Sequence, residues 1–417
     1  MDKMIVQGRH QLNGKVKTSG AKNSALKVLF ATILAEGRHV FKNVPRLKDV
    51  ESTILLLQSL GLQTEWNDNE LIVHSKKLSS MEAHYDLVRK MRASILCLGP
   101  MLAKYGEAVV SLPGGCAIGS RPIDLHLEAM KALGAEVVLK DGYVHAKAKK
   151  LKGAHFLFEN VTVGGTENMM MAASLAEGTT VLENVAKEPE IVDLAEYLNR
   201  MGAKISGYGT SVMKIQGVEK LKAAEHTIMP DRIEAGTLLI AGAITGGEVT
   251  VEDCNSHHIE SLVLKLRESG FKVETEETRV TVFPNKSWEA VDITTAPYPL
   301  FPTDIQAQFM ALMAVAEGTS VISETVFENR FMHVQELMRL GADITPKSRV
   351  AVVRGQPNKL SGAPVMATDL RASASLVLAG LAAHGETQVS RIYHLDRGYE
   401  NLEKKLSSLG AKISRRE

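Results

Sequence analysis

The sequence predicts an α/β fold of two similar domains, assembled from six repeated units. Three observations predict it. The chain has 417 residues, a length that favours two domains over one. Hydrophobic residues make up 45% and charged residues 23%, which is the balance of an ordinary globular protein. A sequence pattern of strand-forming and helix-forming residues also recurs along the chain, and each copy of the pattern contains two kinds of helix.

A glycine ends one helix in every copy of the repeat. The clearest copies begin at Leu34, Leu175 and Val315. Near-constant spacing of about 70 residues between such glycines is the signature of a repeat architecture. The glycines are Gly61, Gly134, Gly202, Gly270, Gly341 and Gly410.

The third copy illustrates the expected order of elements. Residues 166–176 (TENMMMAASLA) are apolar nearly all round, which predicts a helix buried on every side. The alternating residues 179–184 (TTVLEN) predict a strand after a glycine turn. Residues 191–202 (IVDLAEYLNRMG) predict an amphipathic surface helix ended by its glycine, and GAKI begins another strand. The unit is therefore of βαβαββ type.

Apolar helices of the first kind occur in all six units. Three of them can share one core, which divides the units into two domains with a crossover near residues 230–232. The plainest interpretation is that these helices are merely core, and we accept it for most of them, including residues 169–171. They are expected at 23–34, 93–103, 166–176, 233–244, 304–316 and 372–383.

Cationic and polar residues gather at the starts of these apolar helices. A helix N-terminus presents free N–H groups and a partial positive charge, so it is an anion site. Several such ends in one cleft would suit a substrate with many negative charges. The residues at or beside the helix starts are Lys22, Asn23, Arg92, Thr166, Asp304 and Arg371.

Charge and cysteine usage exclude several classes of protein. Lys and Arg number 49 against 48 Asp and Glu, so no generally basic surface for nucleic acid is expected. No run of 18 apolar residues and no signal peptide is present, so no membrane partner is expected. Three cysteines do not make a disulfide framework, and a cytoplasmic location is predicted. The 13 histidines lack metal-ligand spacing, so neither metal nor cofactor is predicted.

A thiol lies in the glycine-rich stretch SLPGGCAIGSRP, residues 111–122. The surrounding glycines predict that Cys116 is exposed and mobile. A guanidinium such as that of Arg121 would lower the pKa of the thiol and raise its reactivity. The alternative is a passive surface cysteine, which is the usual case for an isolated thiol. Cys97 differs, because it lies in an apolar helix and is predicted to be core.

Asp304 follows the proline-rich stretch TAPYPLFPT. Thr303 or Asp304 is expected to cap the next helix, and that role alone could account for the carboxylate. A capping carboxylate can also act as a general base when a substrate hydroxyl lies within reach. Lys22 could be a solvated lysine, and Arg397, in the turn HLDRGYE, could be an ordinary surface arginine.

Several long motifs together resemble those of the UDP-N-acetylglucosamine 1-carboxyvinyltransferases, which are enolpyruvyl transferases. The motifs are SGAKNSAL, MRASI, GGCAIGSRPIDLH, PTDIQAQ, TVFENRFMHVQEL, ATDLRASASLVLAGL and IYHLDRGYE, and the likeness covers nearly the whole chain. The resemblance implies two domains, each an inside-out α/β barrel of three similar units. It also implies that residues 21–229 form one domain, and that residues 1–20 join residues 230–417 in the other.

The family transfers the enolpyruvyl group of phosphoenolpyruvate to the 3′-hydroxyl of UDP-N-acetylglucosamine and releases phosphate, the first committed step of peptidoglycan synthesis. The resemblance implies that Cys116 forms an adduct with phosphoenolpyruvate, donates a proton and reacts with fosfomycin. It makes Asp304 the base, and Lys22, Arg121 and Arg397 a cationic clamp. The glycine-rich stretch around Cys116 is interpreted as a lid that closes over the substrates.

Further substrate contacts are carried over by matching motif. Asn160 stands where some members have lysine, and Gly165 where alanine is common. The contacts are Asn23, Arg92, Pro122, Ile123, Asp124, Leu125, Asn160, Val161, Thr162, Val163, Val326, Arg330, Asp369 and Arg371.

Two rival functions remain open. One is the sister reaction, in which shikimate 3-phosphate accepts the enolpyruvyl group, although the Cys116 stretch and PTDIQAQFM favour the sugar nucleotide. The other is a non-catalytic paralogue that binds UDP-N-acetylglucosamine and regulates the pathway. Retention of Lys22, Cys116, Asp304 and Arg397 argues against a non-catalytic role.

Overall fold

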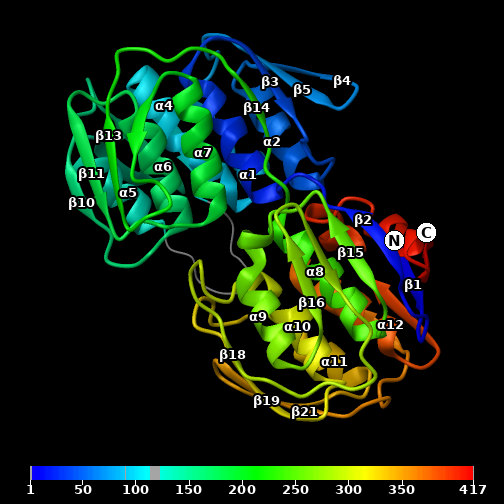
Figure 1. Ribbon diagram of the computed structural model, residues 1–417. Helices are drawn as coiled ribbons and strands as arrows, with labels where there is room; N and C mark the ends of the chain where they lie inside the picture. Colours follow the sequence, from blue (N-terminus) through cyan, green and yellow to red (C-terminus); the bar gives the residue numbers. More distant parts are fainter. Residues whose placement is uncertain (1, 90, 113–122, 417) are drawn as a thin grey trace. The chain divides into compact units, whose positions relative to one another are not determined.

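The computed structural model describes residues 2–89, 91–112 and 123–416 (Figure 1). The chain separates into two compact units. Unit 1 holds residues 2–19 and 230–416, and unit 2 holds the described residues between 20 and 229. Within the described residues, no helix is both long enough and apolar enough to cross a membrane.

Unit 2 contains three four-stranded sheets with the same internal pattern: one parallel pair, then two antiparallel pairs. Their orders are β14-β3-β5-β4, β6-β7-β9-β8 and β10-β11-β13-β12. The strands are β3 (Gly37–Lys42), β4 (Gln63–Asn67), β5 (Glu70–Ser75), β6 (Glu82–Ala83), β7 (Glu107–Ser111), β8 (Glu136–Lys140), β9 (Tyr143–Lys147), β10 (His155–Leu157), β11 (Thr179–Glu183), β12 (Lys204–Ser206), β13 (Val212–Gln216) and β14 (Glu225–Thr227).

Unit 1 repeats the pattern in the orders β16-β17-β15-β2, β18-β19-β21-β20 and β22-β23-β1-β24. Its strands are β1 (Lys3–Gln7), β2 (Gly14–Lys17), β15 (Val249–Glu252), β16 (Val273–Glu276), β17 (Arg279–Val282), β18 (Ile293–Thr294), β19 (Gly318–Ser323), β20 (Asp343–Lys347), β21 (Val350–Gly355), β22 (Pro364–Met366), β23 (Glu386–Ser390) and β24 (Lys412–Arg416).

Each sheet is accompanied by helices of the two predicted kinds. In unit 2 these are α1 (Lys22–Ala31), η1 (Thr32–Leu34), α2 (Lys48–Ser59), α3 (Tyr85–Val88), η2 (Arg92–Cys97), α4 (Leu98–Tyr105), α5 (Asp124–Ala132), α6 (Val163–Ala173) and α7 (Pro189–Arg200). In unit 1 they are α8 (Arg232–Thr245), η3 (Ser256–Ile259), α9 (Glu260–Glu268), η4 (Thr303–Ile305), α10 (Gln306–Met313), α11 (Val334–Arg339), α12 (Leu370–Ala382), η5 (Ile392–Arg397) and α13 (Leu402–Ser408).

The predicted repeat is confirmed. The third copy runs β10, α6, β11, α7, β12, β13, which is the βαβαββ order. Just after the second helix of each copy comes a glycine with φ between 91° and 108°, a backbone conformation that residues with a Cβ rarely adopt. These six are the predicted helix-ending glycines at 61, 134, 202, 270, 341 and 410.

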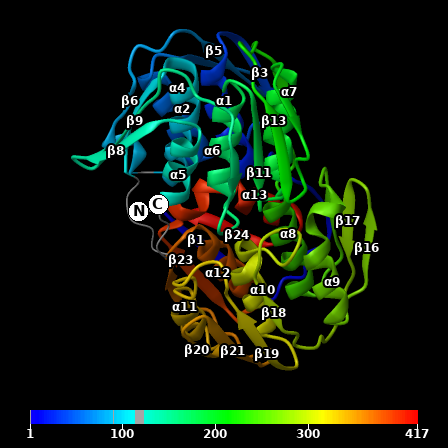
Figure 2. The same ribbon diagram turned by 90° about the vertical axis from the view of Figure 1, so that its left-hand side faces the viewer.

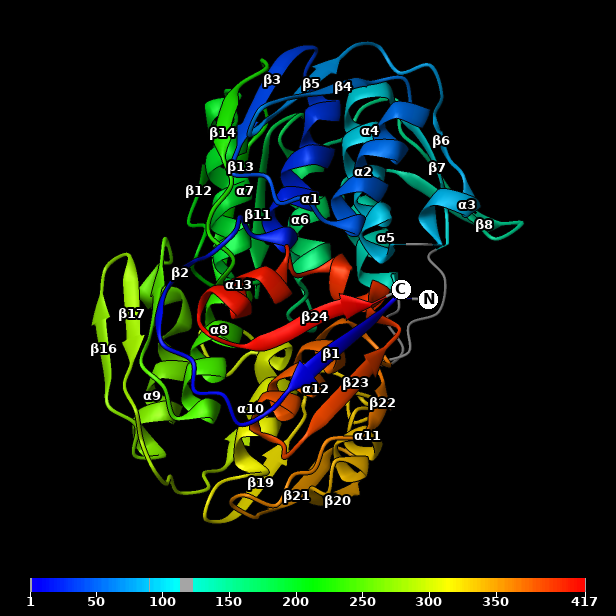
Figure 3. The same cartoon turned by 90° about the vertical axis from the view of Figure 1, so that its right-hand side faces the viewer.

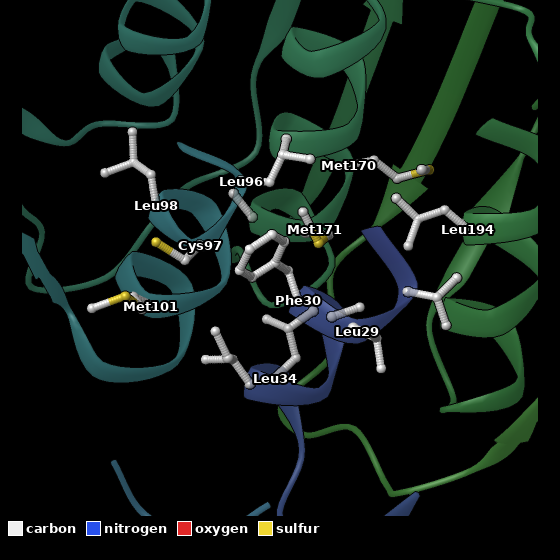
Figure 4. Close-up of a cluster of buried hydrophobic side chains, with 14 of the residues drawn as sticks. Leu29, Phe30, Leu34, Leu96, Cys97, Leu98, Met101, Met170, Met171 and Leu194 are labelled. Atoms are coloured by element: carbon white, nitrogen blue, oxygen red, sulfur yellow. The ribbon is translucent and has the colours of Figure 1, made fainter. Parts of the chain in front are cut away.

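The apolar helices form the interiors of the two units, as predicted. In unit 1, α8, α10 and α12 pack against one another. In unit 2, α1, α4 and α6 lie among the sheets that contain β9 and β11 (Figure 2). Figure 4 shows Phe30, Cys97 and Met171 meeting in this core. Burial raises the pKa of Cys97 to about 12, so the predicted core role of this thiol is confirmed.

Helix α7 differs from the surface helix that its periodicity predicts. Most of its side chains are buried, and it packs against both α1 and α6. Its buried Asp193 accepts hydrogen bonds from Ser24 and His226. The charge of Asp193 is therefore satisfied inside unit 2, whereas Glu196 and Arg200 of the same helix are exposed.

The N-terminal segment contributes strands to two sheets of unit 1. Strand β1 lies between β23 and β24 and is antiparallel to both, with Lys3 opposite Arg416 (Figure 3). Strand β2 pairs in parallel with β15. In unit 2, β14 similarly pairs with β3, the first strand of that unit along the chain. In both units, therefore, strands from opposite ends of the unit's sequence share a sheet.

Candidate active site

Asp304 is the centre of an ion-pair cluster in unit 1. Its Oδ1 accepts a hydrogen bond from Nη2 of Arg330 at 2.7 Å, and its Oδ2 accepts one from Nη2 of Arg371 at 3.3 Å. Both arginine side chains are only 5% exposed, whereas that of Asp304 is 27% exposed. Two guanidinium groups at this distance stabilise the carboxylate anion, which remains open to solvent on one side.

The capping role expected for Thr303 or Asp304 is wrong. The turn η4 begins at Thr303, so its N-cap position is Pro302, and the N-cap position of α10 is Ile305. The Thr303 hydroxyl instead donates to Glu324 at 2.8 Å. The two side chains expected to cap the helix are therefore bound by distant residues. Glu324 accepts from Thr303, and Arg330 and Arg371 donate to Asp304.

Arg371 enters the cluster from the first turn of α12, whose N-cap is Asp369. Asp369 Oδ1 accepts hydrogen bonds from the backbone N–H groups of Arg371 at 2.8 Å and Ala372 at 3.0 Å. The Arg371 guanidinium lies 5.4 Å from the centre of the Tyr399 ring. Nη1 of Arg371 is buried and makes no geometrically ideal hydrogen bond within the described residues.

Two histidines, His333 and His394, feel the charge of Asp369 together with that of a predicted arginine. Burial lowers the pKa of His333 to about 4, with the Asp369 charge opposing the shift and the Arg330 charge adding to it. Burial and the Arg397 charge lower the pKa of His394, again against the effect of Asp369. Arg397 is half-buried at the end of η5. The structure thus brings the predicted residues of unit 1 into one electrostatic neighbourhood.

Val326 belongs to the same neighbourhood through its backbone. It is half-buried in the loop that follows β19, and its N–H group donates to Glu324 Oε1 at 2.9 Å. The valine side chain carries no polar group, so a role for Val326 in substrate binding depends on the position of the loop, which this backbone hydrogen bond fixes.

In unit 2, Lys22 and Asn23 form the first turn of α1, as their helix-start position predicts. Lys22 is not the solvated lysine of the alternative interpretation, because its side chain is only 12% exposed. Its Nζ lies 3.3 Å from Oδ2 of Asp49, which is buried at the start of α2. The ion pair fixes the ammonium group at the end of the helix.

The predicted contacts Asn160, Val161, Thr162 and Val163 lead into α6. Asn160 and Val161 are exposed, whereas Thr162 and Val163 are half-buried. Thr162 caps the helix, because its Oγ1 accepts from the backbone N–H of Gly165 at 3.2 Å. A Cβ added to Gly165 would lie 2.5 Å from Thr162 Cγ2, so an alanine there would displace this side chain. Helix α6 begins at Val163, three residues before the expected start at Thr166.

His126 connects three groups of predicted residues around α5. Burial and the charge of Arg92, at the start of η2, lower the pKa of His126 to about 4. Its Nδ1 lies 3.1 Å from the side-chain amide nitrogen of Asn168 on α6. A Cβ on Gly164 would lie 3.0 Å from the ring, so the glycine allows this close approach. A neutral imidazole thus joins α5, η2 and α6.

The remaining predicted residues lie around the start of α5. Ile123 is buried in the N-cap position, Asp124 is exposed in the first turn, and Leu125 is half-buried. Cys116, Arg121 and Pro122 lie outside the described residues.

Three residues that hold the predicted ones in place escaped the sequence interpretation: Asp49, His126 and Glu324. Asp49 lies in the charged run RLKDVE, which reads as an ordinary exposed helix start. His126 is the last residue of the motif GGCAIGSRPIDLH, but no role was assigned to it, and Glu324 directly precedes the motif TVFENRFMHVQEL. Their partners are distant in the sequence, so no local pattern could reveal them.

Comparisons with known proteins show which family this chain resembles over its whole length. The family model described as EPSP synthase (3-phosphoshikimate 1-carboxyvinyltransferase) matches residues 6–406. A UDP-N-acetylglucosamine 1-carboxyvinyltransferase from Bdellovibrio bacteriovorus is 74% identical over 412 residues, 99% of this chain and 100% of the relative. One from Geobacter metallireducens is 57% identical over 415 residues, 100% of this chain and 99% of that relative.

Two solved structures have the same fold. The enolpyruvyl transferase NikO from Streptomyces tendae superposes with a TM-score of 0.87 at 25% identity, covering 99% of this chain and 98% of its own. An EPSP synthase from Acinetobacter baumannii superposes with a TM-score of 0.77 at 19% identity and covers 100% of both chains.

Proposed function

The chain belongs to the EPSP synthase family of enolpyruvyl transferases, and from this premise we propose that it is a UDP-N-acetylglucosamine 1-carboxyvinyltransferase. The observation that carries the choice of acceptor is the full-length identity of 74% to a relative of that name. The substrates are phosphoenolpyruvate and UDP-N-acetylglucosamine, and the product enters peptidoglycan synthesis in the cytoplasm.

The reaction is an addition followed by an elimination. C3 of phosphoenolpyruvate takes up a proton, C2 becomes oxocarbenium-like, and the 3′-oxygen of the sugar bonds to C2 as its hydroxyl proton is removed. The tetrahedral intermediate then loses phosphate from C2 and a proton from C3, which restores the double bond. The protein must therefore supply a base, an acid and a site for several negative charges.

Asp304 is the base in this proposal. Its carboxylate is held between Arg330 and Arg371, and its side chain is 27% exposed. A carboxylate that a substrate can reach is able to accept a proton from a bound hydroxyl. The finding that Asp304 caps neither η4 nor α10 removes the structural explanation that competed with this role.

Cationic residues of both units bind the anionic groups in this proposal. Lys22, Arg121 and Arg397 hold phosphoenolpyruvate, with Asn23 beside Lys22. Several positive charges around a dianion offset the cost of removing it from water.

The uridine nucleotide is assigned to unit 2 and to the loop after β19. The start of α5, the half-buried start of α6 and Arg92 present backbone N–H groups and positive charge suited to a diphosphate. The contributing residues are Arg92, Arg121, Pro122, Ile123, Asp124, Leu125, Asn160, Val161, Thr162, Val163 and Val326, with Asp369 and Arg371 near the sugar.

Cys116 is proposed as the proton donor to C3 and as the thiol that forms an adduct with phosphoenolpyruvate. We further propose that residues 21–229 and residues 1–20 with 230–417 act as two domains in this reaction.

The test is phosphate release from phosphoenolpyruvate with either acceptor. We expect turnover with UDP-N-acetylglucosamine and none with shikimate 3-phosphate. Turnover only with shikimate 3-phosphate would assign the sister reaction. Nucleotide binding by calorimetry without any turnover would instead make the protein a binding paralogue.

A further inference from the structure

Glu324 is a buried carboxylate to which no role in the reaction has been assigned. It directly follows β19 and is 1% exposed. Its Oε1 accepts hydrogen bonds from the Thr295 hydroxyl at 2.8 Å and from the backbone N–H groups of Val326 at 2.9 Å and Phe327 at 3.1 Å. Its Oε2 accepts one from the Thr303 hydroxyl at 2.8 Å. Four donors thus surround the two carboxylate oxygens of this buried side chain.

Two other copies of the repeat have asparagine at the equivalent position. Asn43 and Asn184 directly follow β3 and β11, the equivalent strands of two other copies, and both have positive φ. Each side-chain amide donates at 2.9 Å to the carbonyl group that follows the neighbouring parallel strand, at Ile228 and Phe158. A neutral amide is therefore enough to connect the two strands.

Glu324 differs from these asparagines in two ways. Its side chain is a carboxylate instead of an amide, and it binds more groups than the neighbouring strand supplies. Its bond to Thr295, which follows β18, corresponds to the connection that the asparagines make. Its bonds to Thr303 and to the loop at Val326 have no counterpart at Asn43 or Asn184 among the described hydrogen bonds. The additional bonds lead toward Asp304.

The hydrogen bonds from this carboxylate have a fixed direction. Glu324 only accepts, so the Thr303 hydroxyl must give its proton to Oε2. The Thr303 oxygen is then left to accept from Nη1 of Arg330, at 3.2 Å. Nη2 of the same guanidinium donates to Asp304 at 2.7 Å. The chain of donors thus runs from Arg330 through Thr303 to Glu324.

We propose that Glu324 is a positioning residue that, through the Thr303 hydroxyl, fixes the Arg330 guanidinium on the Asp304 carboxylate. The same carboxylate holds the backbone of Val326, so one buried group sets both the proposed base and a proposed nucleotide contact. This inference rests on the proposed function for its catalytic meaning, but its geometric content concerns unit 1 alone.

The first test compares Thr303→Val, which lacks the side-chain hydroxyl, with Thr303→Ser, which keeps it. Losing the hydroxyl should release Arg330 and weaken its effect on Asp304, so that Asp304 is protonated at higher pH. We expect Thr303→Val to move the acidic limb of the kcat/KM profile upward by about 1 pH unit, the lower end of what a close opposite charge produces. We expect a loss of about 10- to 100-fold in kcat, as for a charged hydrogen bond.

Thr303→Ser, which keeps the hydroxyl, should keep the acidic limb near its wild-type position. Glu324→Gln should resemble Thr303→Val, because an amide nitrogen in place of Oε2 would donate to Thr303 and reverse the chain. Asn184→Ala removes a comparable structural bond in unit 2 and should lower the melting temperature without moving the acidic limb. An unshifted limb in both Thr303→Val and Glu324→Gln would overturn the proposal.

A crystal structure of Thr303→Val tests the geometry without any measurement of activity. We expect the Arg330 guanidinium to leave its 2.7 Å contact with Asp304 in this variant and to retain it in Thr303→Ser. A retained contact in Thr303→Val would refute the positioning role even in an active enzyme. A wild-type protein without turnover would instead refute the proposed function, while this comparison of structures still decides the role of Glu324.

Discussion

At the scale of single residues, the candidate site shows which groups a sequence can reveal. Lys22, Asp304 and Arg371 lie in long motifs that identify a family, and the structure places each beside an opposite charge. Asp49, which pairs with Lys22, and Glu324, which accepts from the Thr303 hydroxyl, were not recognised, because these contacts join residues that no spacing rule connects. The capping role expected at Asp304 was wrong for the same reason: long-range arginines compete for the carboxylate.

Replacing Asp304 by asparagine should separate catalysis from structure. The amide has the shape of the carboxylate and can still accept from Arg330, but it cannot take the hydroxyl proton. We expect kcat to fall by about 10²- to 10⁴-fold, the range of general base catalysis. Steady-state phosphate release measures the loss, and an unchanged circular dichroism spectrum checks the fold. A near-native rate would remove Asp304 from the chemistry.

Cys116 can be tested by exchanging its thiol for another acid. Cys116→Ala should lower the rate by about 10²-fold or more, because the proposed proton donor is lost. Cys116→Asp supplies an acid of similar reach, so it should keep activity and lose sensitivity to fosfomycin. The measurement is the activity that wild type and Cys116→Asp each retain after preincubation with fosfomycin. Equal inhibition of wild type and Cys116→Asp would exclude the thiol as the target.

At the scale of elements, the repeat was readable because its causes are local. Alternation predicted β11, and apolar composition predicted the buried helices. The glycines after the surface helices were predicted because few other residues adopt their positive φ. The burial of α7 could not be predicted in this way. Its Asp193 and Glu190 read as surface charges, and only their packing against neighbouring helices makes them interior groups.

The contact of α6 with α1 should make stability depend on pH. Burial raises the pKa of Glu167 to about 7 from 4.5, although the charge of Lys27, 3.2 Å away, opposes the shift. Glu188 and Glu190 also face this carboxyl group and raise its pKa further. Because the folded pKa is the higher one, the contribution of Glu167 to stability is complete below pH 4.5 and is lost as the pH rises to about 7.

The measurement is urea unfolding of wild type and Glu167→Gln between pH 4.5 and 8. The wild-type free energy of unfolding should fall relative to that of the variant by roughly 3 kcal/mol over this interval, since each pKa unit corresponds to about 1.4 kcal/mol. Position 167 of the variant carries no titrating group, so the variant serves as the baseline for all other carboxylates and for the histidines. Parallel curves would show that Glu167 does not titrate as stated.

At the scale of the whole molecule, the order of strands was the least predictable feature. The resemblance implied that residues 1–20 belong with the C-terminal half, but no local pattern shows that β1 is an inner strand of its sheet. Pairing of β1 with β23 and β24 is a contact between the two extremes of the chain. Hydrophobic alternation predicts a strand and gives no information about its neighbours.

The pairing of β1 predicts the outcome of two rearrangements. Deleting residues 1–17 removes an inner strand from one sheet and the edge strand β2 from another, so unit 1 should not fold. A circular permutant that joins the original ends by a short Gly-Ser linker should fold, because Lys3 and Arg416 are already paired. Its new ends can open in the turn at residues 68–69, between β4 and β5.

Thermal melting and limited proteolysis compare the two variants with wild type. We expect a cooperative transition for the permutant and protease-sensitive unit 1 for the deletion variant. A deletion variant as resistant as wild type would show that β1 is dispensable.

The place of β1 also constrains how the chain is made in the cell. Strand β1 is translated before the strands of unit 2, whereas both of its partners, β23 and β24, are translated after them. Its sheet therefore cannot be completed until β24 has been made, whereas the sheets of unit 2 can be completed earlier. During that interval β1 lacks its native partners, and its apolar residues Met4, Ile5 and Val6 are available to chaperones that bind extended segments.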